Sequence, residues 1–214
     1  TNVSASVATS ETVYFELFDY SGGDVTLGTV TGTVGSSGYL YVSAYGEDGG
    51  AVTVGDVNIT VAKNGSASLS VSASSNSATA DVTVGNVTFS GNKADEASVD
   101  IENQGDYPGN VMVGDVSITG FTGIYLDISR SVWESDAAPG NLTVGNVTLS
   151  ADKSGSFEVS ISNTGYNLGV GDLTIGDIDI SLAQSATGSF DVENYGYWYN
   201  TADDVTVGNT TIGN

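Results

Sequence analysis

The stretch VTVGNV at residues 82–87 decides the fold, because close copies of it recur along the whole chain of 214 residues. Each copy has an aliphatic residue, any residue, an aliphatic, glycine, a polar residue and an aliphatic, except that Thr210 ends the last one. The copies are VTLGTV (25–30), VTVGDV (52–57), VTVGNV (82–87), VMVGDV (111–116), LTVGNV (142–147), LTIGDI (173–178) and VTVGNT (205–210). Their glycines, 27 to 32 residues apart, are Gly28, Gly55, Gly85, Gly114, Gly145, Gly176 and Gly208. Such a period is typical of repeats that bury their apolar faces by stacking on one another.

Inside the motif, the alternation of buried and exposed positions shifts by one residue at the glycine. Val82 and Val84 share one face, and Val87 and Phe89 share one face, but the two pairs are three residues apart. A bend at Gly85 returns both pairs to one interior, and glycine tolerates the backbone angles that a bend requires. A second alternating segment precedes each copy, for example residues 97–103 and 124–130. Each repeat therefore offers about three short faces around one core.

Together these features predict an all-β, parallel β-solenoid of seven rungs of about 30 residues with essentially no helix, spanning residues 11–214. Stacking turns equivalent positions into inward columns. One is Leu27, Val54, Val84, Val113, Val144, Ile175 and Val207; another runs from Val30 through Val57, Val87, Val116, Val147 and Ile178 to Thr210. The alternative is a pair of antiparallel β-sandwiches, which also have many short strands. The uniform glycine position favours the solenoid.

Composition excludes several classes of function. The chain has 26 acidic and 4 basic residues, a net charge of −22, which repels nucleic acid and anionic membrane surfaces and attracts divalent cations. It has no Cys and no His, so disulfides, zinc sites of the usual kind, Cys nucleophiles and His bases are absent. No apolar run approaches the length of a membrane span. A secreted chain whose signal peptide has been removed has these features, and so has an excerpt of a longer chain.

A polar column follows the bend: Thr29, Asp56, Asn86, Asp115, Asn146, Asp177 and Asn209. Asp and Asn form hydrogen bonds to nearby backbone in tight turns, which predicts a structural corner. The alternative is a row of calcium ligands at Asp56, Asp115 and Asp177. These carboxylates are two rungs apart, roughly 10 Å, which is too wide for one calcium ion and favours the structural interpretation. No other cofactor is expected.

Two further features suggest surfaces. An outward column of Thr26, Thr53, Thr83, Met112, Thr143, Thr174 and Thr206 resembles the flat threonine arrays of solenoidal ice-binding proteins, although Thr also suits any exposed strand position. Aromatic residues gather in the loops, among them Trp133, Tyr197, Trp198 and Tyr199. Such rings pack on the rod itself, form contacts between subunits or stack on sugars.

The sequence does not predict an enzyme. A polysaccharide lyase needs a strong base, and Arg130, the single arginine, is expected to be a surface partner of acidic neighbours. A hydrolase needs paired carboxylates, and the repeat places Asp100, Asp127, Glu158 and Asp191 in one outward column. No departure from the repeat marks a cleft there.

The ends of the rod carry no recognisable cap, although open strand edges normally need one. Residues 1–10 form an arm in which Val3, Ala5 and Val7 alternate like a spare strand. The arm of one subunit could add to the open edge of the next and give a head-to-tail filament. The predicted interface residues are Val3, Ala5, Val7, Trp133, Tyr197, Trp198 and Tyr199.

The repeat, for instance VGNVTLSAD at 144–152, is similar to the β-helical repeats of bacterial surface adhesins and filamentous-haemagglutinin-like proteins. The resemblance implies a secreted location and an adhesive or structural role. We therefore expect an extracellular structural protein, a subunit of a self-assembling fibre or surface appendage whose partner is itself. The alternative is a secreted module that binds glycan or the cell-surface matrix through loop aromatics, and the third is an ice-binding protein. Neither nucleic acid nor membrane insertion is expected.

Overall fold

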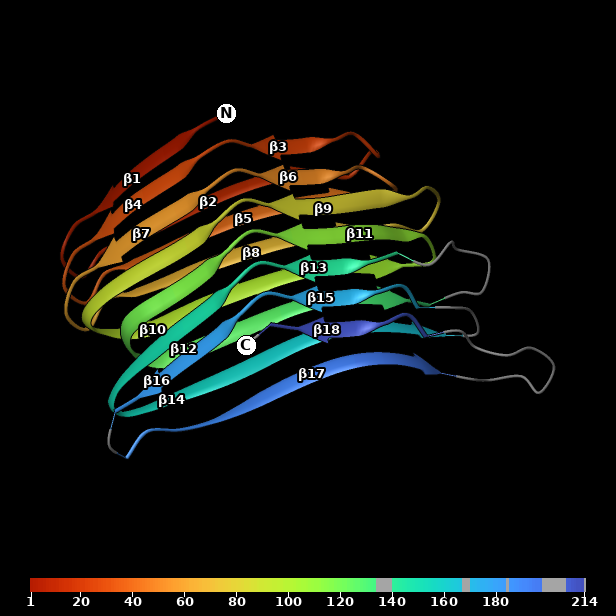
Figure 1. Cartoon of the computed structure of the whole chain (residues 1–214). Helices are drawn as coiled ribbons and strands as arrows, with labels where there is room; N and C mark the ends of the chain where they lie inside the picture. Colours follow the sequence, from red (N-terminus) through yellow and green to blue (C-terminus); the bar gives the residue numbers. More distant parts are fainter. Residues whose placement is uncertain (134–139, 167–169, 184, 198–206, 214) are drawn as a thin grey trace.

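The computed structural model describes residues 1–133, 140–166, 170–183, 185–197 and 207–213 (Figure 1). This part of the chain is a parallel β-solenoid: it contains no helix, and its strand pairs all run parallel. It therefore also holds no apolar helix that could cross a membrane. The predicted fold is confirmed, and the antiparallel sandwich is wrong.

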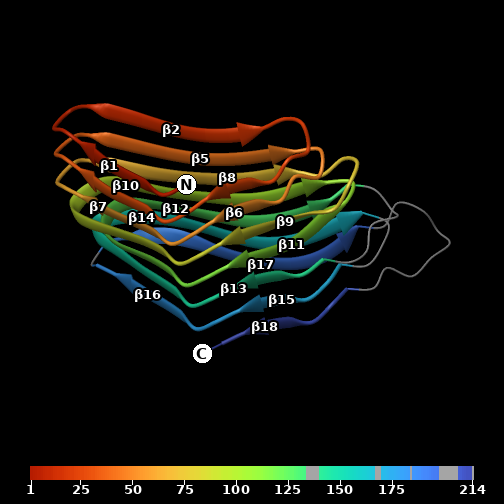
Figure 2. The same cartoon turned by 90° about the horizontal axis from the view of Figure 1, so that it is seen from above.

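Each turn of the chain passes through three layers, as the bend at the motif glycine predicts. Figure 2 shows a long layer on one side, with two shorter layers meeting at an angle on the other. The long layer consists of β2 (Thr12–Asp19), β5 (Tyr39–Glu47), β8 (Ser66–Ser74), the second parts of β10 (Val87–Gly105), β12 (Val116–Val132) and β14 (Val147–Tyr166), and β17 (Thr187–Tyr197).

The other two layers carry the repeated motif. The short layer is a seven-stranded sheet of β3 (Val25–Leu27), β6 (Val52–Val54), β9 (Ala80–Val84), β11 (Pro108–Val113), β13 (Leu142–Val144), β15 (Leu173–Ile175) and β18 (Thr210–Ile212). The linking layer is formed by β1 (Val3–Val7), β4 (Val30–Val34), β7 (Val57–Val61), the first parts of β10, β12 and β14, and β16 (Ile178–Leu182). Because β10, β12 and β14 run through both, the linking and long layers form one eleven-stranded sheet.

The core consists of columns of identical positions, because parallel strands without register drift superpose the same motif position in every turn. The two predicted columns are in register and buried from Leu27 to Ile175 and from Val30 to Val147. Ile178 continues the second column and is partly buried. Aliphatic residues thus fill the interior from all three layers.

The last copy of the motif is not where the repeat predicts it. Thr210, Thr211 and Ile212 of β18 pair with Leu173, Thr174 and Ile175. Val207 forms an isolated bridge to Val170 instead. The prediction of VTVGNT as the seventh copy is therefore wrong. The segment 205–214 holds two consecutive versions of the pattern, VTVGN and TTIGN, and periodicity alone cannot choose between them.

The predicted arm belongs to the stack. Strand β1 pairs in parallel with β4, Val3 opposite Val30 and Val7 opposite Val34, and Val7 is buried. The division of the chain at residue 10 is corrected accordingly, because residues 3–7 form the first strand of the linking layer. The outer edge of β1 has no partner strand among the described residues.

Candidate functional site

The polar column at the bend is a chain of side-chain to backbone hydrogen bonds from one turn to the next. The backbone N–H of Asn86 donates to Asp56 Oδ1 at 2.8 Å, and that of Asp115 donates to Asn86 Oδ1 at 2.9 Å. The N–H of Asn146 donates to Asp115 Oδ1 at 2.7 Å, and that of Asp177 to Asn146 Oδ1 at 2.9 Å. Asp and Asn are equivalent in this column because each hydrogen bond requires only one acceptor oxygen from the side chain. The structural interpretation is confirmed from Asp56 to Asp177, but the prediction that Asn209 ends this column is wrong, because its N–H donates to Asp172 instead.

The same column explains why glycine precedes each of these residues. A Cβ added to Gly145 would lie 2.5 Å from Asp115 Oδ1 and 2.9 Å from Asp115 N. A Cβ on Gly176 would lie 2.6 Å from Asn146 Oδ1. The polar side chain of one turn therefore occupies the space where the next turn would place a Cβ, and only glycine leaves room for it.

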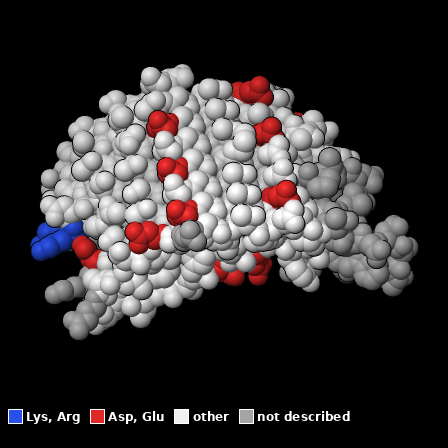
Figure 3. Space-filling view, viewed as in Figure 1, with Lys and Arg blue, Asp and Glu red and all other residues white. Residues whose placement is uncertain are grey.

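The geometry gives the calcium interpretation of Asp56, Asp115 and Asp177 no support. An Asn stands between successive Asp residues in the column, so the carboxylates stay two turns apart. Acidic side chains on this face lie separately rather than in a cluster (Figure 3). The described residues hold no group of three or more His, Cys, Asp or Glu suited to a metal ion.

A second polar column lies at the opposite end of the short layer and was not predicted. The N–H of Asn110 donates to Asp81 Oδ1 at 2.7 Å, that of Asn141 to Asn110 Oδ1 at 3.0 Å, and that of Asp172 to Asn141 Oδ1 at 2.9 Å. The N–H of Asn209 continues the chain by donating to Asp172 Oδ1 at 2.7 Å. The signal was present in the sequence, since Asp or Asn directly precedes most copies of the motif.

The carboxylate column on the outer face of the long layer differs from the predicted one at one position. Asp100, Asp127 and Asp191 are in register, but Ser160 rather than Glu158 stands between the last two. Glu158 is opposite Tyr125 in the neighbouring column. The prediction that Glu158 shares the column is wrong, because Asp127 lies 13 residues after Gly114, whereas its partner Ser160 lies 15 residues after Gly145.

Burial and mutual repulsion perturb these carboxyl groups. Desolvation raises the pKa of Asp100, and desolvation together with the charge of Asp100 raises the pKa of Asp127. Burial raises the pKa of Glu102, with a smaller contribution from Asp100 and Asp127. The hydroxyl of Tyr125 donates to Asp127 Oδ2 at 3.3 Å, whereas Asp127 Oδ1 is buried without a described partner. Carboxylate oxygens readily accept hydrogen bonds from hydroxyl groups.

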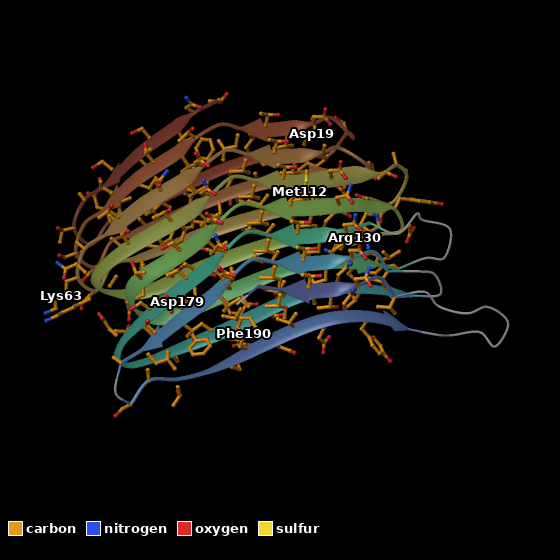
Figure 4. All side chains as sticks on the ribbon, in the orientation of Figure 1. Asp19, Lys63, Met112, Arg130, Asp179 and Phe190 are labelled. Carbon is orange, nitrogen blue, oxygen red and sulfur yellow. The ribbon has the colours of Figure 1, made fainter. Side chains whose placement is uncertain are left out.

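Arg130 is not the predicted surface partner of acidic neighbours. Its side chain is fully buried, and Figure 4 places it at the corner between the long and short layers. Nε donates to Gly109 O at 2.7 Å, Nη2 to Pro108 O at 2.8 Å and Nη1 to Asn163 Oδ1 at 3.2 Å. Burial lowers the pKa of Arg130 to about 10. Arg130 therefore holds backbone carbonyls at a corner and does not face any outer surface.

Arg130 belongs to an inward polar column that the alternation of the strands does not reveal. It is in register with Asn103 on one side and with Asn163 and then Asn194 on the other. Asn103 Nδ2 donates to Ala80 O at 2.8 Å, and Asn163 Nδ2 donates to Gly171 O at 3.2 Å. These side chains donate hydrogen bonds to backbone carbonyls where the long strands turn toward the short layer. The hydrogen bonds between neighbouring strands do not reach those carbonyls.

A groove of about 720 Å³ opens on the outer face of the long layer. Its residues come from β10, β12, β14 and β17, and the polar and aromatic ones are Glu96, Ser98, Tyr125, Ser156, Phe157, Glu158, Thr187 and Ser189. Gly123 is one of the residues that line it, and an added Cβ there would meet no atom closer than 3.6 Å. The absence of a side chain at this position helps to form the groove. The sequence reasoning missed it.

The structure describes the predicted threonine column and only some of the predicted surface aromatic residues. The threonine column is in register from Thr26 to Thr174, with Met112 at 45% exposure within it (Figure 4), and Thr211 takes the place predicted for Thr206. Trp133 is 46% exposed. Tyr197 ends β17, and Trp198 and Tyr199 lie outside the described residues. Ice binding stays a prediction that a thermal-hysteresis measurement tests.

Comparisons with protein-family models, with curated proteins and with solved structures find no match to this chain.

Proposed function

We propose that the protein is an extracellular structural protein whose solenoids stack end to end into a fibre. The observation that carries the proposal is that both end turns expose the same interior columns and unpaired strand edges. The loose resemblance of the repeat to bacterial surface proteins supports the location.

At the first turn, the apolar residues of β2 lack a covering strand. Val13, Phe15 and Leu17 point toward the core but are only partly buried. Their in-register partners one turn on, Leu40, Val42 and Ala44, are at most 1% exposed. Among the described residues, strand β2 pairs only with β5, and β3 is the last strand of the short layer.

The last turn has the same character. Phe190 is 37% exposed, whereas Val159, its partner one turn back, is 1% exposed. Leu182 of β16 and Ile212 of β18 are 46% and 45% exposed. The strands β16, β17 and β18 each pair on one side only within the described residues. Their open edges can accept further parallel strands.

The two ends of the solenoid match each other because the same inward columns run from one end to the other. Phe15 and Phe190 are the first and last members of one inward column, and Leu17 and Val192 are the ends of the next. If β2 of one copy pairs with β17 of another in the same register, Phe15 lies over Phe190 and both columns continue without a break. Burial of these side chains and pairing of three strand edges favour association, and the net charge of −22 opposes it. Added salt therefore favours assembly.

Electron microscopy of the purified 214-residue chain tests the proposal, at neutral pH, with and without calcium and at low and high salt. We expect long, uniform fibres. Phe15→Lys and Phe190→Lys place a charge on the inner face of each edge strand and should each leave monomers. The matched controls Glu16→Lys and Asp191→Lys carry the same change on the outer face of the same strands and should polymerise.

Mixing the two blocked variants separates failed docking from failed folding. Phe15→Lys retains an intact β17 end, and Phe190→Lys retains an intact β2 end. Together they should form one junction, a 1:1 dimer by analytical ultracentrifugation, and no longer species. Monomeric wild-type protein under all four conditions, or a mixture without dimers, refutes end-to-end stacking.

A further inference from the structure

One column on the outer face of the long layer is polar or aromatic along its whole length. The in-register residues are Tyr14, Tyr41, Ser68, Ser98, Tyr125, Glu158 and Ser189. Each carries a hydroxyl or a carboxylate. Neither this column nor the two outward columns beside it contain Lys or Arg. With turns about 4.8 Å apart, the column runs along the axis for roughly 29 Å.

Aromatic rings dominate the first two turns of this face. Tyr14 is 66% exposed and lies 6.2 Å from the ring of Tyr39 and 5.9 Å from that of Tyr41. Beside them, Tyr20 lies 5.1 Å from Phe18 and 5.7 Å from Tyr45. Ring contacts of this kind hold the side chains in place before any ligand binds, which lowers the entropic cost of binding.

The groove lies further along the same column. Ser98, Tyr125, Glu158 and Ser189 all line it. The hydrogen bond from the Tyr125 hydroxyl to Asp127 restrains the ring at the groove wall. Because Gly123 has no side chain, there is room beside the Tyr125 ring for a bulky group. The face therefore combines a cluster of mutually inclined aromatic rings with a groove lined by hydroxyls and carboxylates.

We propose that this column binds a linear, uncharged polysaccharide lying along the axis of the solenoid. The C–H faces of sugar rings pack on Tyr14, Tyr41 and Tyr125, and sugar hydroxyls bond to the hydroxyls of Ser98 and Ser189 and to Glu158. The carboxylates on the face repel anionic polymers, and they repel a second copy of this chain for the same reason. The proposal does not depend on fibre formation.

Depletion of the protein from solution by insoluble polysaccharides tests the proposal. The probes are cellulose, chitin and mannan, with calcium alginate beads as the anionic comparison. We expect binding to at least one neutral polysaccharide and none to alginate. Tyr14→Ala combined with Tyr125→Ala should weaken that binding about tenfold, since two stacked rings are lost. Tyr125→Phe retains the ring and should weaken it less.

Two controls test the location. Trp133→Ala removes an exposed loop aromatic outside the column, and Met112→Ala removes an exposed apolar side chain on the short layer; both should bind as wild type. Circular dichroism confirms that each variant is folded. Failure to bind all three neutral polysaccharides, binding to alginate alone, or binding that follows Trp133 rather than the two tyrosines overturns the proposal.

Discussion

Replacing Gly145 by alanine should destabilise the solenoid much more than the same change at Gly123. The added methyl group at Gly145 would lie 2.5 Å from Asp115 Oδ1, 2.8 Å from the carbonyl carbon of Gly114 and 2.9 Å from Asp115 N. Two of these atoms are backbone, so the turns must move apart. Forcing extra volume into a packed site costs about 1–3 kcal/mol. Displacing the Asp115 side chain also breaks its hydrogen bond to the N–H of Asn146, which costs about 1 kcal/mol more.

The expected loss is therefore about 2–4 kcal/mol, or a fall in melting temperature of roughly 4–16 °C for a chain of this size. Thermal unfolding followed by far-UV circular dichroism measures it. At Gly123 the nearest atom would be 3.6 Å away, an ordinary contact, and alanine also restricts the unfolded chain, so Gly123→Ala should melt at or slightly above wild type. Equal melting of the two variants would refute the account of the motif glycine.

Three further outcomes follow from the polar columns. Asp115→Asn keeps the acceptor oxygen and should unfold in urea like wild type, whereas Asp115→Ala should lower the free energy of unfolding by about 1 kcal/mol. Calcium should change the stability of neither variant. A calcium-dependent difference would revive the metal interpretation. Asp100, Glu102 and Asp127 have pKa values raised in the folded chain, so stability should rise as the pH falls from neutral toward their ordinary values and be lost as the pH rises through the raised ones. Melting temperatures across this range should show that rise, and changing all three to amides should flatten it. Arg130→Met should cost about 3 kcal/mol in urea unfolding. Three acceptors lose donors at about 1–3 kcal/mol each, or roughly 6 kcal/mol in total, and about 3 kcal/mol is recovered because no charge is buried. A stabilised variant would contradict this.

The groove illustrates what periodicity can and cannot locate. The repeat correctly identified which residues of the long strands point outward, and it placed Asp100 and Asp127 side by side. It misplaced Glu158 by one column, since the bulges near Ser90 and Thr119 change the count of residues between motif and long strand from turn to turn. A groove that spans several turns depends on these offsets, and a single sequence does not show them.

Arg130 was misjudged for a different reason. An arginine in an alternating strand is expected on the polar face, and burial of an unpaired charge is costly. The corner after the long strand presents carbonyls without partners, however, and the fork of the guanidinium reaches Gly109 O and Pro108 O together. The need for these hydrogen bonds arises only once the corner is built.

The sequence by itself determined the fold: the motif repeats, the glycine at each bend and the alternating aliphatic residues leave parallel stacking as the arrangement that buries every column. It also predicted the first polar corner, because Asp and Asn beside a turn glycine bond locally. Only the tertiary structure decided which of two consecutive patterns, residues 205–209 or 210–214, completes the last turn, where β1 lies and how the outer columns align. These depend on register between turns, which is fixed by contacts between residues about 30 positions apart and not by any local preference.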